Sequence, residues 1–132
     1  MDISKLDMTE HANRGAQLQV LHPVNKTPIE GMIITLLGTD STLYRQRFAA
    51  WRQKFINTNN VPGINDAEEQ AMECRAACTV NWKGMERDGK PYECTPQNVR
   101  ELYSNPGYSW LVEQVDAFIQ DRSNFFVIAD GS

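Results

Sequence analysis

The sequence predicts an α+β protein with an N-terminal β-hairpin followed by a mainly α-helical region of about four helices. Strand-type patterning is confined to residues 15–38, whereas apolar residues recur at helical spacing between 41 and 122. No internal repeat interrupts this order, and 132 residues suffice for one domain. We therefore expect a flexible N-terminal arm over residues 1–14 and a single α+β domain over 15–132.

The hairpin prediction rests on the stretch GAQLQVLHPVNKTPIEGMIITLLG. Gln17 and Gln19 alternate with apolar neighbours in its first half, and a β-branched run occupies its second half. Between them, residues 23–28 begin and end with proline and supply a turn. A two-stranded hairpin is not stable alone in water, so its apolar side must be covered by helices or by another subunit.

A helix is expected over residues 41–56, because Asp40 or Ser41 can cap its first turn. Its aromatic residues fall on one side and its cations cover much of the rest: Tyr44, Phe48, Trp51 and Phe55, and Arg45, Arg47, Arg52 and Lys54. The turn-rich segment 57–65 ends this helix. Its basic side could attract nucleic acid, but a solvated face is the simpler interpretation. A net charge of −4 and a pI near 5.1 also disfavour a dedicated nucleic-acid binder.

The next helix is predicted to begin at Asp66, with Glu69 completing a capping box. One face of this helix carries small apolar residues, namely Ala67, Ala71, Cys74 and Cys78. Trp82 is expected at the end of the same helix. The dipeptide Asp88-Gly89 then predicts a tight turn.

Two further helices complete the predicted fold. Thr95 followed by Pro96 is typical of a helix start, and this helix should run through Tyr103. The segment 105–107, Asn-Pro-Gly, ends it, and a last helix is expected from about 108 to 122. The apolar tail NFFVIADGS either docks as an extended segment or stays loose.

The cysteines and histidines allow a metal site or a nucleophile but favour neither. Cys74 and Cys78 could share a zinc ion with Cys94 and either His11 or His22, yet no C-x-x-C knuckle occurs, and burial in the core is the simpler interpretation. Cys94 lies near a helix start that could lower its pKa, but no base is close to it in sequence. Phosphate-binding and serine-hydrolase motifs are absent from the sequence. We therefore expect no catalytic residue, no cofactor, no metal and no enzymatic activity.

Membrane insertion and secretion are not expected either. The longest uncharged apolar run, residues 32–38, is too short to span a bilayer, and residues 1–11 hold no apolar signal core. An odd number of cysteines also suits reduced thiols in the cytoplasm.

The stretch NWKGMERDGKPYECTPQNVREL, residues 81–102, has two interpretations. It is a packed corner between two helices in the simpler one, with Trp82 and Tyr92 filling the corner. In the other it is a partner surface, since tryptophan and tyrosine are favoured interface anchors. The candidate partner-binding residues are Trp82, Tyr92, Tyr103, Tyr108 and Trp110. The aromatic side of residues 41–56 is a further option.

Two motifs in this chain occur in the same order in a known family. The first is HPVNKTPIEGMIITLLGTDSTLYR, and the second extends from 80 to 119. The second contains Val80, Trp82, Gly84, Asp88, Gly89, Pro91, Tyr92, Thr95, Pro96, Asn98, Val99, Arg100, Leu102 and Pro106. Together they resemble tail assembly chaperones of long-tailed, siphovirus-like bacteriophages and prophages, over roughly half of the chain. Cys94 departs from the pattern, which more often has a phenylalanine-like residue there, and segment 57–70 has no counterpart in it.

The resemblance implies a non-enzymatic chaperone that binds and solubilises the tape measure protein and helps recruit tail tube subunits. It also implies action in the host bacterial cytoplasm and absence from the mature virion. Helix-in-groove contact is the expected binding mode, and a homo-oligomer is compatible with it. The alternative is a structural virion component, either tail-tube-associated or a tail terminator, because a hairpin that extends a neighbour's sheet would suit a ring.

Overall fold

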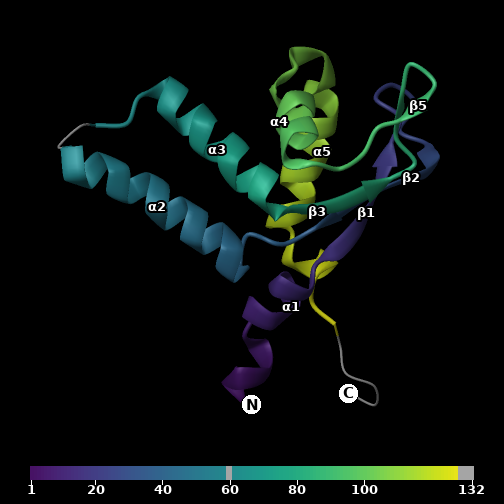
Figure 1. The fold of residues 1–132 in the computed structure, drawn as a ribbon. Helices are drawn as coiled ribbons and strands as arrows, with labels where there is room; N and C mark the ends of the chain where they lie inside the picture. Colours follow the sequence, from purple (N-terminus) through teal and green to yellow (C-terminus); the bar gives the residue numbers. More distant parts are fainter. Residues whose placement is uncertain (59–60, 128–132) are drawn as a thin grey trace.

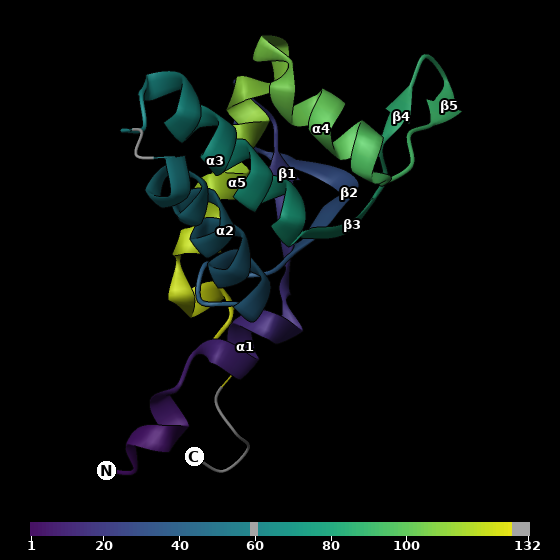
Figure 2. The same cartoon turned by 60° about the vertical axis from the view of Figure 1, so that its left-hand side comes forward.

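The computed structural model describes residues 1–58 and 61–127. In this part of the chain five α-helices, three short 3-10 helices (η) and five strands follow one another. They are η1 (Ile3–Leu6), α1 (Thr9–Arg14), β1 (Ala16–Leu21), β2 (Pro28–Leu36), α2 (Thr42–Thr58), α3 (Ile64–Cys78), β3 (Thr79–Lys83), β4 (Glu86–Arg87), β5 (Lys90–Pro91), α4 (Pro96–Ser104), η2 (Pro106–Tyr108), α5 (Ser109–Gln120) and η3 (Arg122–Asn124). Figure 1 shows β1–β3 in one sheet, with α2 and α3 projecting from it as a two-helix arm. The small β4–β5 hairpin stands at the opposite end of the molecule (Figure 2).

The predicted fold class is wrong in its arrangement. The chain begins with helices rather than with the hairpin, it has five α-helices in the described residues rather than about four, and its main sheet has three strands. Residues 1–14, expected as an arm, contain η1 and α1. The side chain of Asp2 accepts a hydrogen bond from the Ser4 amide at 3.0 Å, and that of Asp7 from the Thr9 amide at 2.9 Å. Such side-chain caps start turns too short to show a periodic apolar pattern, so the sequence pattern missed them.

The hairpin within residues 15–38 is confirmed, but it is part of a larger antiparallel sheet of order β1–β2–β3. Leu18 lies opposite Ile34, and Ile34 lies opposite Trp82, so these three side chains share one face of the sheet. Trp82 is thus in a strand and not at the end of the cysteine helix. Only one of the five residues of β3 is buried, and such a short segment offers no alternation that the sequence could reveal.

The α2–α3 arm is an insertion between two neighbouring strands. Leu36, at the end of β2, pairs with Thr79, the first residue of β3. Next to this pair, the Leu37 amide donates to the Cys78 carbonyl at 2.8 Å. The chain therefore leaves the sheet and returns to it at the same place.

The core lies between the sheet and the last two α-helices, α4 and α5. The sheet contributes Val20, Ile34, Leu36 and Trp82, and the helices contribute Val99, Leu102, Tyr103, Leu111, Val115 and Ile119. The four-residue spacing of Leu111, Val115 and Ile119 places these buried side chains on one face of α5. Helices thus cover the hairpin's apolar side within one chain.

Two of the three predicted helix N-caps are confirmed. The Ser41 hydroxyl accepts from the Tyr44 amide at 3.2 Å, and the Thr95 hydroxyl accepts from the Asn98 amide at 3.1 Å. The third is wrong, because α3 begins at Ile64 with Gly63 as its N-cap. Asp66 is the third residue of α3 and accepts a hydrogen bond from the Gly63 amide at 2.9 Å. It therefore has the reciprocal role in the capping box that was assigned to Glu69.

The turn and the tail complete the comparison with the sequence. Asp88 and Gly89 have φ of 53° and 80° and form the predicted tight turn between β4 and β5. In the tail, Phe125 is buried and Phe126 is half-buried, and residues 128–132 lie outside the described part. No helix in the described ranges combines the length and the apolar composition that a membrane span needs.

Candidate functional site

The five candidate partner-binding residues fall into two groups. Trp82 and Tyr103 are buried in the core, with 6% of each exposed. Tyr92, Tyr108 and Trp110 line one surface pocket, to which β4, η2 and α5 contribute residues. The fold therefore brings three of the five residues together at one place, although the sequence separates them by as many as eighteen positions.

Trp82 is a packing residue, as in the corner interpretation of residues 81–102, but it packs from strand β3 and not from a corner between two helices. Its indole nitrogen donates to the Tyr92 carbonyl at 2.6 Å, and the two rings stack with centroids 5.6 Å apart. The Tyr92 hydroxyl then donates to the Asn98 carbonyl at 3.1 Å. These bonds fix the backbone between β3 and α4. Trp82 does not line the pocket itself but positions Tyr92, which does.

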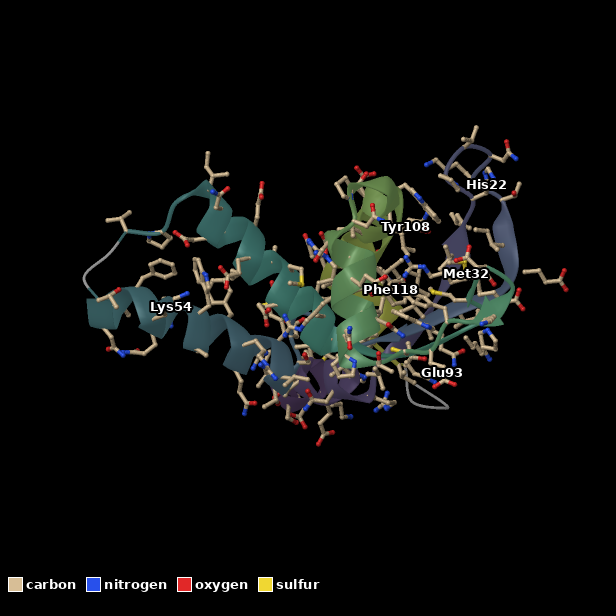
Figure 3. The ribbon with its side chains drawn as sticks, turned by 45° about the horizontal axis from the view of Figure 1, so that its top comes forward. His22, Met32, Lys54, Glu93, Tyr108 and Phe118 are labelled. Carbon is tan, nitrogen blue, oxygen red and sulfur yellow. The ribbon has the colours of Figure 1, made fainter. Side chains whose placement is uncertain are left out.

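The pocket has a volume of about 220 Å³ and an apolar floor. Met32 from β2, Met85, Leu102 from α4 and Leu111 from α5 contribute to it. Tyr108 is 40% exposed, and Figure 3 shows it on the same side of the molecule as Met32, away from the arm. An aromatic and methionine lining is adaptable in shape, because thioethers rotate freely and present polarisable surface.

Charged groups complete the lining. Arg87 from β4 forms an ion pair with Glu101 from α4 and also lies over the Tyr92 ring, with its guanidinium carbon 5.6 Å from the ring centroid. Both side chains are about half exposed, at 57% and 46%, so the pair is a solvated feature of the rim. Glu86 and Asn105 line the same pocket. The site therefore combines an apolar floor with polar groups that a partner's backbone or charged side chains can contact.

Gly84 determines how closely the β3–β4 connection can approach β2. Its φ is +77°, and a Cβ atom built on it would lie 2.1 Å from the Gly31 carbonyl oxygen. No side chain fits in this gap, and an L-residue would also be strained at this φ. Gly84 thereby brings Met85, the next residue, close to Met32, the residue after Gly31, and both methionines line the pocket.

The lining and the volume of the pocket indicate what it can bind. Among its described lining residues there is neither a cysteine nor a histidine, and burial raises the pKa of Tyr92 above its ordinary value. Small-molecule sites usually enclose about 300–1,000 Å³. A hollow of about 220 Å³ is better suited to one or two side chains of a protein partner.

The sequence did not identify Met32, Met85, Leu102 or the Arg87–Glu101 pair as site residues. They come from three separate segments, at residues 32, 85–87 and 101–102, and their proximity results from the pairing of β3 with β2 and from the packing of α4 and α5. Glycine at positions 31 and 84 is the one signal in these segments, since both have positive φ, but a single sequence does not show that the two approach each other.

The surroundings of the cysteine and histidine side chains favour structural roles for them. Burial raises the pKa of the Cys78 thiol to about 11 and that of Cys74 above its ordinary value. Cys94 is half-buried, and burial raises its pKa as well, opposite to the lowering that a nucleophile requires. The His11 ring lies against the Phe126 ring at a tilt, with centroids 4.6 Å apart, and the imidazole of His22 accepts from amides in its own turn. Within residues 1–58 and 61–127, no three histidine, cysteine, aspartate or glutamate side chains are grouped so as to hold a metal ion.

A second hollow of about 300 Å³ lies between α2, α3 and α4. Arg100 and Glu73, which form an ion pair, line it together with Arg47, and the Arg100 guanidinium holds the pKa of Glu73 below its ordinary value. None of the five candidate partner-binding residues lines it. Its polar lining makes it a weaker candidate for an apolar partner than the Tyr92, Tyr108 and Trp110 pocket.

No protein-family model, no curated protein and no solved structure matches this chain. Its function is therefore inferred from its own residues and from the motif resemblance.

Proposed function

We propose that this protein is a non-enzymatic phage tail assembly chaperone that binds the tape measure protein and keeps it soluble. The observation that carries the proposal is the convergence of Tyr92, Tyr108 and Trp110 on one apolar pocket. All three residues lie within the second motif that resembles such chaperones, residues 80–119, and Tyr92 is one of its matching residues.

The pocket's form supports contact with a helix. An amphipathic helix binds in a groove through a few apolar anchors spaced three or four residues apart. One such anchor fits the floor made by Met32, Met85 and Leu111, and Tyr108 at the rim can cover it from solvent. Methionine-rich lining accepts anchors of different shapes, which suits a long partner that presents many similar helical segments.

The remaining parts of the proposal follow from the resemblance. The chaperone would deliver the tape measure protein to tail tube subunits in the host bacterial cytoplasm and would be absent from the mature virion. It would require no cofactor, metal, nucleic acid or membrane for this role.

Co-expression with the tape measure protein tests this proposal. We expect soluble tape measure protein to be recovered with this chain in a pull-down, and to be insoluble when it is expressed alone. If the tape measure protein is not retained, and this chain instead assembles into rings on its own, the structural virion component becomes the better interpretation.

A further inference from the structure

Helix α2 is long but poorly covered. None of its residues is buried, although it carries Phe48, 36% exposed, and Ile56, 61% exposed. At the start of α3, Ile64 is 81% exposed. Helices in proteins gain most of their stability from packing an apolar face against other elements. Two helices alone cannot enclose the surface between them, so the outer half of the arm lacks covering among the described residues.

An aromatic row follows α2 outward along the arm. The ring centroids of Phe48 and Trp51 are 5.9 Å apart, and those of Trp51 and Phe55 are 5.1 Å apart. The Lys54 amine lies 5.8 Å from the centroid of the Phe55 ring. Figure 3 shows Lys54 far out on the arm, on the opposite side of the molecule from Met32 and Tyr108. Phe48 is exposed and Trp51 and Phe55 are half-buried, so this aromatic row is only partly covered, and it is separate from the pocket.

Charge is segregated between the two helices of the arm. Helix α2 contains four cations and no acidic residue, namely Arg45, Arg47, Arg52 and Lys54. Helix α3 contains four acidic residues and one arginine, namely Asp66, Glu68, Glu69, Glu73 and Arg75. In the described part of the chain, Glu73 and Arg75 form ion pairs with other elements, whereas the four cations of α2 and the carboxylates of Glu68 and Glu69 form none.

We propose that the arm is a self-association surface, on which the arm of a second copy of this chain docks about a two-fold axis. An isologous contact requires a surface that is complementary to itself, and this arm carries both charges beside one apolar row. A two-fold arrangement places α2 of each copy against α3 of the other. Arg52 and Lys54 then face the second copy's acidic residues, and the four helices form a bundle that encloses Trp51 and Phe55.

The charge pattern favours a second copy over an unrelated partner. A uniformly acidic or basic partner would complement one helix of the arm and repel the other, whereas a second arm complements both at once. In the resulting dimer the two pockets lie away from the contact, because Met32 and Tyr108, which line each pocket, are on the opposite side of the molecule from Lys54 and the outer arm (Figure 3). This self-association does not depend on the proposed tail-assembly function.

Charge exchange between two variants of the full chain tests the proposal. Sedimentation velocity over a range of protein concentrations should show a monomer–dimer equilibrium that weakens as sodium chloride is raised. Glu68→Lys with Glu69→Lys makes both helices of the arm basic, and Arg52→Glu with Lys54→Glu makes the outer half of both acidic. The homodimer of each double variant should have a dissociation constant at least about tenfold higher than that of the wild type, because like charges meet in its contact.

An equimolar mixture of the two double variants should form a heterodimer close to the wild-type dimer in stability, since opposite charges meet at both contacts again. The matched control is Glu30→Lys with Glu113→Lys, which changes the net charge equally at exposed positions on the sheet and on α5 and should leave the dimer unchanged. Circular dichroism of each variant establishes that the helices persist. A monomer at every concentration, or a mixture no more associated than its components, would overturn the proposal. If the arm is protected from solvent only when tape measure protein is bound, and not by a second copy of this chain, the proposal is also overturned.

Discussion

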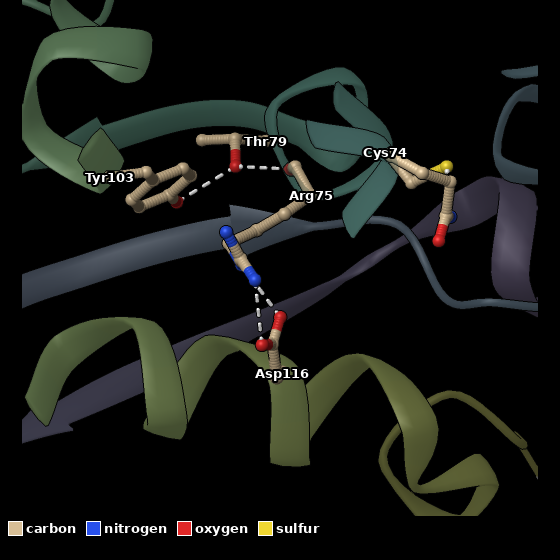
Figure 4. A network of polar contacts seen from close by, with 6 residues as sticks. Cys74, Arg75, Thr79, Tyr103 and Asp116 are labelled. Atoms are coloured by element: carbon tan, nitrogen blue, oxygen red, sulfur yellow. Dashed lines mark hydrogen bonds and ion pairs between the residues drawn. The ribbon is translucent and has the colours of Figure 1, made fainter. Parts of the chain in front are cut away.

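Arg75 and Asp116 form a bidentate ion pair that joins α3 to α5. The Arg75 Nε and Nη2 atoms donate to the two Asp116 carboxylate oxygens at 2.7 and 2.8 Å (Figure 4). Behind the pair, the Thr79 hydroxyl donates to the Arg75 carbonyl at 3.0 Å and lies 2.8 Å from the Tyr103 hydroxyl. The base of the arm is thus attached to the core by a polar network that includes α3, β3, α4 and α5.

Asp116→Ala should destabilise the protein, because the Arg75 side chain is only 9% exposed and would lose its counter-charge. Breaking a fully buried pair costs about 3–5 kcal/mol, and we expect about 2 kcal/mol here, since Asp116 is 35% exposed and water can approach the site. Urea unfolding followed by tryptophan fluorescence measures this. Glu113→Ala on the same helix is the control, and an equal loss in both variants would contradict a specific role for the pair.

Gly84→Ala should be more damaging than Gly89→Ala. Both glycines have positive φ, +77° and +80°, but an added Cβ meets the Gly31 carbonyl oxygen at 2.1 Å only at Gly84, and nothing within 4 Å at Gly89. Gly89→Ala therefore reports backbone strain alone, at about 1 kcal/mol, whereas Gly84→Ala adds a steric clash and should cost about 3 kcal/mol. Thermal unfolding compares the two. Equal costs would show that the chain at Gly84 can move away from β2.

Stability should decline in alkali partly through Tyr103. Burial raises its pKa from 10.0 to about 12, so the folded phenol stays neutral while the unfolded one ionises. The contribution is complete below pH 10 and is lost as the pH rises to about 12, and it is on the order of 2 kcal/mol. Tyr103→Phe removes this titration and the contact with Thr79. The variant should be less stable than wild type near neutral pH, and the difference should shrink between pH 10 and 12 in urea titrations.

A constant difference across that range would mean that Tyr103 ionises alike in both states. Cys78 titrates at a lower pH than Tyr103, since burial raises the pKa of its thiol only to about 11, from 9.0. The Tyr103→Phe comparison isolates the tyrosine, since the Cys78 contribution is common to both proteins.

Tyr108→Ala should weaken binding of the tape measure protein without loss of stability. Tyr108 is 40% exposed at the pocket rim, so its removal leaves the core intact. Truncation of an interface anchor raises the dissociation constant about tenfold or more. Val24→Ala, at the exposed β1–β2 turn, is the control and should leave affinity unchanged. Binding by isothermal calorimetry distinguishes the two, and undiminished affinity in Tyr108→Ala would remove the pocket from the proposal.

The parts of the fold that the sequence predicted are those with local signals. The hairpin has alternation and a proline-bounded turn, α4 has Thr95 and Pro96, and the β4–β5 turn has Asp88-Gly89. The strand β3 could not be predicted, because its pairing partner β2 is some forty residues earlier and its own five residues are mostly exposed. The same separation explains why the site was only partly predicted. Three of its aromatic residues could be named from the sequence, but the pocket floor that Met32 helps to form could not.

The arm begins beside Leu36 and ends beside Thr79, on adjacent strands of one sheet. Its two helices can therefore be shortened or lengthened together, by whole turns at their outer ends, without a change in the pairing of any strand. Such a segment tolerates insertion and deletion that the sheet does not. The distance between the outer end of the arm and the pocket is a dimension that can vary while the rest of the molecule keeps its shape.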